Sequence, residues 1–181
     1  GPDFQPDYLK IYPCALLKSA PLHSKWQSGQ YRPYAEKQLI NLIKSIKKII
    51  PGYARIQRIT RDIPSASIIA GPAKISNLRQ LIADKMKNEN WSCRCIRCRE
   101  IGARYDRRDK LRLYRCDYQA SGGWEIFLSF EDYEQKKLYS LLRLRIPSSG
   151  NQPIFPILKH SALIRELHTY GRQLPIAEKS T

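Results

Sequence analysis

The sequence predicts an α/β segment followed by an α+β segment, and a change of hydrophobic period along the chain is the main observation behind this prediction. In the first half, a strand, a long amphipathic helix and a second strand follow one another. This order is typical of a parallel βαβ unit in an open sheet or a barrel. In the second half, apolar and polar residues alternate with period two and no helix intervenes, which indicates an antiparallel meander.

The elements of the first half follow from periodicity and from turn residues. Residues 7–17 form an apolar, strand-like run, and residues 18–33 are polar and rich in turn residues, which favours a loop. Residues 34–50 carry apolar side chains at steps of three and four, and a Pro-Gly pair ends this predicted helix. Residues 53–59 alternate like a strand, and residues 65–75 are expected to be a linker.

A second helix and four strands complete the predicted elements. Residues 76–90 have an apolar helical stripe and lead directly into a cysteine-rich stretch. Beyond it, strands are predicted at residues 112–119, 124–130, 138–146 and 161–170. We place the domain boundary near the cysteines, where the period changes.

The cysteine-rich stretch has the spacing C-x-C-x2-C, and a fourth thiol follows its last cysteine by eighteen positions. Arginines are interleaved with these thiols, and burying an unpaired arginine is costly, so ordinary core packing explains the pattern poorly. Structural zinc is commonly held by four thiolates at the corners of a tetrahedron. The sequence therefore predicts a structural zinc with the ligands Cys93, Cys95, Cys98 and Cys116.

Three alternatives to zinc are open for these thiols. They can be ordinary reduced cysteines, disulfides or ligands of an iron–sulfur cluster. Cysteines two residues apart are badly placed for a disulfide, and the spacing is not a common ferredoxin pattern. The fifth thiol, Cys14, lies in an apolar setting and is expected to pack as a small hydrophobic residue.

The charge of the chain points to a polyanionic partner. Lys and Arg number 32 and Asp and Glu 16, which gives a formal net charge of +16. A chain this basic most often binds nucleic acid, whereas a surface built for solubility mixes the two signs more evenly. No apolar run approaches the roughly twenty residues of a membrane helix, and no signal peptide is visible, so the cytoplasm is the expected compartment.

Several separated stretches carry a resemblance to a known family. In order along the chain these are LKIYP, SGQYRPY, RIQRITRDIP, NLRQLIADKM, CIRCREIG, ASGGWEIFLSFED, LLRLRIP and IRELHTYG. Together they resemble the catalytic subunit of Elongator, the enzyme that modifies the wobble uridine of tRNA. The resemblance covers nearly all of the chain.

This resemblance implies a fold and a division of the chain into three parts. Residues 1–75 would be the C-terminal βαβ portion of a radical S-adenosylmethionine barrel of TIM-like form. Residues 76–118 would be a helix and a zinc-binding linker. Residues 119–181 would be the first antiparallel strands of a GNAT-type acetyltransferase sheet.

The resemblance also implies an activity for the whole enzyme. It would use acetyl-CoA, S-adenosylmethionine and an iron–sulfur cluster to form a carboxymethyl-type group at carbon five of the wobble uridine. The expected partners are tRNA and accessory subunits of the Elongator type, and no membrane. For the family member, the alternative is a protein lysine acetyltransferase; for this segment by itself, it is a zinc-stabilised tRNA-binding module.

The sequence departs from the family pattern in two motifs. None of the five cysteines forms the C-x3-C-x2-C pattern of a radical cluster, and no Q/R-x-x-G-x-G/A loop follows Tyr170. That loop would bind the CoA pyrophosphate through backbone amides. We therefore expect this segment to bind neither acetyl-CoA tightly nor the S-adenosylmethionine-ligating cluster, and to be inactive by itself.

Two further groups of site residues follow. On the last strand, Glu166, His168 and Tyr170 share one face, and the resemblance places them beside the acetyl-CoA site as candidate catalytic residues. A half-exposed strand face with cross-strand partners is the alternative. The basic residues expected to contact tRNA are Arg55, Arg58, Arg61, Arg94, Arg97, Arg99, Arg104, Arg107, Arg108, Lys110, Arg112 and Arg115.

Overall fold

The chain folds into two compact units in the computed structural model. The model describes residues 2–75, 77–148, 150, 155–158 and 160–171. One unit, here called the helical unit, is Tyr8–Cys98; the other, the sheet unit, combines Gly1–Asp7 with Arg99–Thr181. The boundary between the two units therefore falls directly after the third clustered cysteine, and the assignment of residues 76–118 to a linker stays a prediction.

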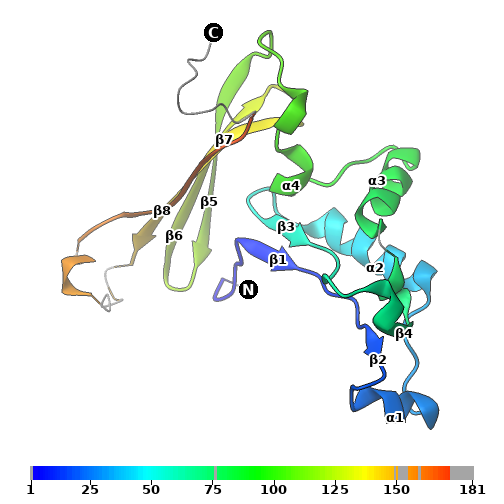
Figure 1. Ribbon diagram of the computed structural model, residues 1–181. Helices are drawn as coiled ribbons and strands as arrows, with labels where there is room; N and C mark the ends of the chain where they lie inside the picture. Colours follow the sequence, from blue (N-terminus) through cyan, green and yellow to red (C-terminus); the bar gives the residue numbers. More distant parts are fainter. Residues whose placement is uncertain (1, 76, 149, 151–154, 159, 172–181) are drawn as a thin grey trace, which may run out of the picture. The chain divides into compact units, whose positions relative to one another are not determined.

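The helical unit contains the predicted βαβ arrangement (Figure 1). Strands β1 (Tyr8–Lys10) and β3 (Arg55–Arg58) pair in parallel, and helix α2 (Glu36–Ile49) connects them. Helix α3 (Leu78–Asn88) packs against α2. The helix is confirmed, and its buried side chains recur at helical spacing, but the predicted apolar stripe holds only in part: Leu42 and Ile49 are exposed, whereas Lys47 is buried.

Two expectations for this unit were wrong. Residues 65–75 are not a linker, because β4 (Ile68–Ala70) pairs in antiparallel fashion with β2 (Leu16–Leu17). Residues 18–33 are not all loop, because α1 (Leu22–Gln27) lies within them. Both elements are short, and a pairing as short as that of β2 and β4 depends on tertiary contacts that local sequence patterns do not report.

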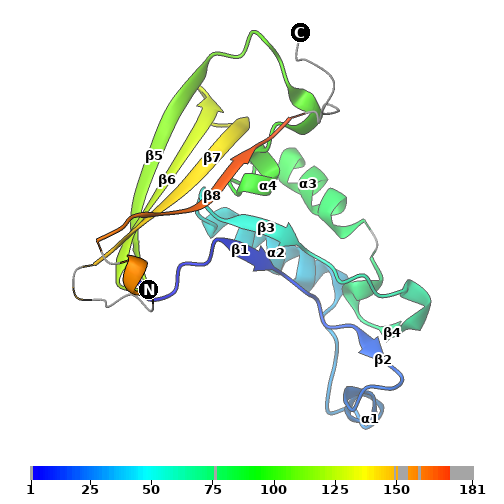
Figure 2. The ribbon, with the colours of Figure 1, turned by 60° about the vertical axis from the view of Figure 1, so that its left-hand side comes forward.

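The sheet unit is a four-stranded antiparallel meander, as predicted (Figure 2). Its strands, β5 (Leu111–Ala120), β6 (Gly123–Asp132), β7 (Leu138–Pro147) and β8 (Leu163–Thr169), pair in chain order. Ser121 and Gly122 form a two-residue turn between β5 and β6, with φ of 45° and 67°. Positive φ at both central positions is typical of the type I′ hairpin turn, whose twist matches that of the strands.

One face of this sheet is buried and rich in charge. Arg143 is 1% exposed, and it contacts Glu166 at 2.7 Å and Asp7 at 3.2 Å. Arg165 donates two hydrogen bonds to the Asp7 carboxylate, at 2.6 and 2.9 Å, and another to Glu125. These ion pairs explain why the first seven residues belong to the sheet unit, although they are far from it in sequence.

The opposite face of the sheet carries apolar side chains that are open to solvent. Leu113 on β5 is opposite Phe130 on β6, and Leu167 on β8 is opposite Leu142 on β7. Leu113 is 57% and Leu167 71% exposed. Among the described residues, no helix has the length and apolar character that crossing a membrane requires.

A buried ion pair stands at the start of the sheet unit. Arg99 is 5% and Glu131 2% exposed, and the guanidinium donates to the carboxylate. Glu131 also accepts a hydrogen bond of 2.6 Å from Ser129. This pair stabilises the fold only while both partners are present, because either charge by itself would be buried without compensation.

We predict that Arg99→Met destabilises the sheet unit by about 3–5 kcal/mol, because Glu131 then stays buried without its cation. Trp124 is on β6 of this unit. In a background with Trp26→Phe and Trp91→Phe, its fluorescence during urea unfolding reports this unit separately. Arg107→Met, at an exposed position, is the matched control, and equal shifts of the two urea midpoints would contradict the prediction.

Candidate functional site

Three of the predicted zinc ligands come together at the end of the helical unit. The Sγ atoms of Cys93, Cys95 and Cys98 all lie within 4.8 Å of one another. Sulfur atoms around a tetrahedral zinc lie roughly 3.8 Å apart, since each Zn–S bond is about 2.3 Å long. Cys93 and Cys95 are buried and Cys98 is half-buried. The donor set and its geometry therefore fit a thiolate-bound zinc.

Local hydrogen bonds bring the thiols together. The Cys95 amide donates to Cys93 Sγ at 3.4 Å, and the Cys98 amide donates to the Cys95 carbonyl at 3.0 Å. The latter bond forms a turn that leads into the short helix α4 (Ile96–Arg99). The Ile96 amide donates to the Ala54 carbonyl at 3.0 Å, just before β3. Residues 93–98, here called the thiol-bearing loop, are thus attached to the βαβ unit by a backbone hydrogen bond.

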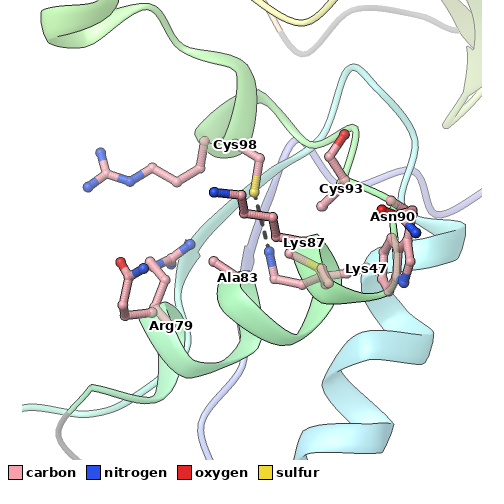
Figure 3. A pocket seen from close by; sticks show the side chains of 12 residues that line it. Lys47, Arg79, Ala83, Lys87, Asn90, Cys93 and Cys98 are labelled. Carbon is pink, nitrogen blue, oxygen red and sulfur yellow. Dashed lines mark hydrogen bonds between the residues drawn. The ribbon is translucent and has the colours of Figure 1, made fainter.

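A buried lysine accompanies the thiols. Lys47 is 2% exposed, and its Nζ lies 3.3 Å from Cys98 Sγ (Figure 3). Within the described part of the chain, no carboxylate forms an ion pair with Lys47. A buried ammonium requires an anionic partner, and Cys98 would supply one when a bound metal holds it as a thiolate. Zinc with three thiolates carries a net charge of −1, which Lys47 would offset.

The thiols influence one another's ionisation. Hydrogen bonds from Cys93 and Cys98 lower the pKa of Cys95. The hydrogen bonds of Cys93 to Cys95 and Cys98, together with burial, raise the pKa of Cys93. One thiolate is therefore stabilised at the expense of its neighbours, and a divalent metal, whose charge favours all three thiolates, would displace the remaining protons.

Cys116, the fourth ligand of the sequence prediction, is outside this group of three. It is exposed in the middle of β5, opposite Phe127, and belongs to the sheet unit. Its role as a ligand stays a prediction. The expectation for Cys14 was wrong, because its thiol is exposed.

Most of the basic residues expected to contact tRNA are exposed, but Arg99 is not. Its guanidinium is buried against Glu131, so the structure removes Arg99 from the candidate surface. Arg55 is half-buried. The remaining exposed candidates are Arg58, Arg61, Arg94, Arg97, Arg104, Arg107, Arg108, Lys110, Arg112 and Arg115.

Some of these exposed cations already have acidic neighbours. Arg108 pairs with Asp106 at 2.9 Å, and Arg115 pairs with Asp117 at 2.8 Å. Exposed pairs of this kind are worth about 0–1 kcal/mol, so a phosphate can compete with them. Arg112 lies over the ring of Tyr133, with its guanidinium carbon 4.5 Å from the ring centroid.

The three candidate catalytic residues differ in their surroundings. Glu166 accepts a hydrogen bond of 2.7 Å from the buried Arg143. The rings of His168 and Tyr170 have centroids 4.3 Å apart, which places both side chains on one face at the end of β8. Glu166 is therefore held in an ion pair, whereas His168 and Tyr170 form a separate aromatic pair.

Lys47 is the site residue that sequence reasoning missed. It follows the buried Ile43 by one helical turn and so continues the core stripe of α2. The pattern of the helix placed it among the polar positions, because lysine is almost never fully buried unless it is paired. A lysine in register with a core stripe is the signal that could have found it.

Comparison with known proteins agrees with the motifs in the sequence. Residues 6–88 match the family model of the Radical_SAM C-terminal domain. The chain is 42% identical over 177 residues to the tRNA uridine(34) acetyltransferase of Methanocaldococcus infernus, which covers 94% of this chain and 33% of that protein. It is 38% identical to the human Elongator complex protein 3, over 99% of this chain and 33% of that protein.

A solved structure gives the same result in three dimensions. The archaeal Elp3 of Methanocaldococcus infernus with an N-terminal deletion superimposes with a TM-score of 0.83 and 41% sequence identity. The match covers 97% of this chain and 42% of that one. The resemblance to the catalytic subunit of Elongator is confirmed. This chain spans about a third of the length of the curated Elongator-type relatives that it matches.

We predict that this Elongator-like chain binds about one zinc, and that Cys95→Ser loses it while Cys14→Ser keeps it. Structural zinc contributes on the order of 10 kcal/mol to folding, so the Cys95 variant should also unfold more easily. Elemental analysis of the purified chain measures the metal. Iron in place of zinc, or full stability without metal, would contradict a structural zinc site. If Cys116→Ser retains zinc, Cys116 is not the fourth ligand.

Proposed function

We propose that this chain is the central segment of a tRNA-modifying acetyltransferase of the Elongator catalytic type. The observation that carries the proposal is identity of 38–43% over 94–99% of the chain to proteins named tRNA uridine(34) acetyltransferase or Elongator complex protein 3. The substrate in this proposal is the wobble uridine, and the product is a carboxymethyl-type group at its carbon five.

We assign the two units to the two chemistries of such an enzyme. The parallel βαβ arrangement of β1, α2 and β3, within the residues that match the Radical_SAM C-terminal domain, supports a barrel portion. The meander of β5 to β8 supports the beginning of a GNAT-type sheet. Residues 76–118, which carry the metal loop, follow the barrel portion and precede the sheet portion in sequence, although the compact units divide after Cys98.

In this proposal the metal of the chain is structural. Three thiolates, with the Lys47 ammonium beside one of them, would hold the zinc and fix the loop against the βαβ unit. S-adenosylmethionine with an iron–sulfur cluster, and acetyl-CoA, supply the radical and acyl chemistry of the whole enzyme. The five reduced thiols suit a reducing compartment, which supports a cytoplasmic protein.

The surface for tRNA in this proposal is the exposed basic set that follows the metal loop. Arg104, Arg107, Arg108 and Lys110 lie within seven residues, and Arg112 follows on β5. Phosphate contacts provide affinity that does not depend on base sequence and that falls as salt concentration rises. Accessory Elongator-type subunits would be additional partners of the whole enzyme.

We predict that the double variant Arg107→Glu/Arg112→Glu binds tRNA about tenfold more weakly or worse, and that its salt dependence is shallower by about two phosphate contacts. Binding of labelled tRNA at several salt concentrations measures both. Lys18→Glu/Lys37→Glu is the matched control, since it changes the net charge equally at exposed positions of the helical unit. If tRNA affinity falls equally in the two double variants, net charge alone explains the loss, and the proposed tRNA surface is refuted.

On β8 we propose that His168 and Tyr170 act at the acetyl-CoA site, and that Glu166 positions the strand through Arg143. The proposal rests on the ring pair of His168 and Tyr170 and on the ion pair that already occupies Glu166.

The corresponding experiment needs a form of the protein extended at both ends to the length of its relatives. We expect its acetyl-CoA hydrolysis to rise on addition of tRNA, and His168→Ala or Tyr170→Phe to lower the turnover rate while tRNA affinity is unchanged. Glu166→Gln should lower stability more than rate. Stimulation by a lysine-containing peptide instead of tRNA would favour the protein lysine acetyltransferase, and binding of tRNA without hydrolysis would favour a binding module.

A further inference from the structure

A pocket of about 540 Å³ opens beside the thiol group, entirely within the helical unit (Figure 3). Its walls are α3, the segment that follows it and the thiol-bearing loop, and Cys93 and Cys98 are part of its lining. This volume lies within the range of roughly 300–1,000 Å³ that is usual for small-molecule sites. None of the proposed roles of the thiols, the exposed arginines or β8 uses this pocket.

The lining of the pocket is strongly cationic. Lys47, Arg79, Lys87 and Arg97 all contribute to it, and no Asp or Glu is among its lining residues. Figure 3 shows Lys47, Arg79 and Lys87 arranged around Ala83 of α3, with the Cys98 sulfur nearby. Several like charges around one cavity repel one another, and a bound anion would relieve that repulsion.

Two of these cations, Arg79 and Lys87, have N–H donors that no described residue uses. Arg79 spends Nη2 on the carbonyls of Ile56, at 3.2 Å, and Gln57, at 3.3 Å. In the described part of the chain, no carboxylate forms an ion pair with Arg79 or Lys87. The two carbonyls fix one edge of the Arg79 guanidinium, and its other N–H groups remain for a ligand. A guanidinium held in this way suits a phosphate, which it can bind with two parallel hydrogen bonds.

An aromatic wall and neutral polar groups complete the pocket. Trp91 lines it, and its indole is oriented by a hydrogen bond of 2.9 Å from Nε1 to Glu89. Lys48 lies over the same ring, with Nζ 5.2 Å from the centroid. Gln80, Asn90 and Ser92 add amide and hydroxyl groups to the lining. Aromatic rings of this kind stack against nucleobases, and amides and hydroxyls pair with base edges and ribose.

We infer that this pocket binds one nucleotide, with its phosphate at Arg79, Lys87 and Arg97 and its base against Trp91. Lys47, which also lines the pocket, adds positive charge to it while its Nζ donates a hydrogen bond to Cys98 Sγ. The nucleotide can be free or part of an RNA strand, and both present the same phosphate and base. In the second case the inference rests on the proposed tRNA function and adds a defined site to it; in the first case it is independent of that function.

The variants for the test come in matched pairs. Lys87→Gln removes a lining charge, and Lys85→Gln removes an exposed charge two residues earlier on α3 that is not part of this pocket. Arg97→Gln and Arg94→Gln form a second pair in the cysteine-rich stretch, where Arg97 lines the pocket and Arg94 does not. The metal content of every variant is measured first, so that loss of the metal is recognised separately from loss of the ligand.

The measurement is calorimetric titration of the chain with uridine monophosphate and with a short single-stranded RNA. Each lining charge makes a charge-assisted hydrogen bond, so Lys87→Gln and Arg97→Gln should each weaken uridine monophosphate about tenfold. Trp91→Ala should weaken it by a similar factor through lost stacking, with Trp26→Ala on α1 as its control.

The possible outcomes distinguish a free nucleotide from a nucleotide within an RNA strand, and they distinguish this pocket from the proposed tRNA surface. Binding of the mononucleotide with these losses supports the site even when the exposed arginines fail to bind tRNA. Binding of RNA only, weakened by Lys87→Gln and not by Lys85→Gln, supports a nucleotide within a strand. Absence of both, or equal effects in the lining and control variants, overturns the inference.

Discussion

The buried ammonium of Lys47 is the interaction on which the helical unit's functional part depends. It lies in the core stripe of α2, one turn beyond Ile43, and its Nζ is 3.3 Å from Cys98 Sγ. A charge in this position requires an anion, and the thiol loop provides it. The same contact places the loop over α2 and α3, which brings Cys93 and Cys98 into one wall of the cationic pocket. Metal loop, helix stripe and pocket are thus coupled through one lysine.

In the sheet unit, too, buried cations have anionic partners, and there the anions are carboxylates. Arg99 pairs with Glu131, both of them buried, and the buried Arg143 pairs with the half-buried Glu166 and Asp7. Such pairs are specific rather than strongly stabilising, because desolvation of both charges offsets most of their attraction. Their functional consequence is clear: two residues that the sequence suggests for tRNA contact and catalysis, Arg99 and Glu166, are engaged in holding the sheet together.

The proposed enzyme therefore divides its work between the exposed arginines that follow the thiol cluster and the cations that line the pocket. Exposed arginines that follow the metal loop would give the long-range, salt-sensitive attraction expected for tRNA. The cations around the pocket would act at short range, because its concave walls exclude part of the water and strengthen each contact. A small-molecule site beside the three clustered thiols would also explain why Arg79 has donors that no described residue uses.

Much of this structure was predictable from sequence, and the limits have a physical reason. Periodicity was sufficient for α2, α3 and the four long strands, since each has a face whose spacing repeats over many residues. Spacing and charge were sufficient for the three clustered thiols, because their backbone positions are fixed by a local turn. The family resemblance, too, was present in separated motifs.

Tertiary structure alone decided the partners of the charged residues. Periodicity cannot tell that Lys47 points inward, that Arg99 meets Glu131 or that Asp7 joins the sheet through Arg165, because these contacts link residues 32 to 158 positions apart. The short β2–β4 pairing was missed for the same reason. The sequence determined which local elements form and which residues can hold a metal; which charges are buried and which remain for a ligand was decided only by long-range packing.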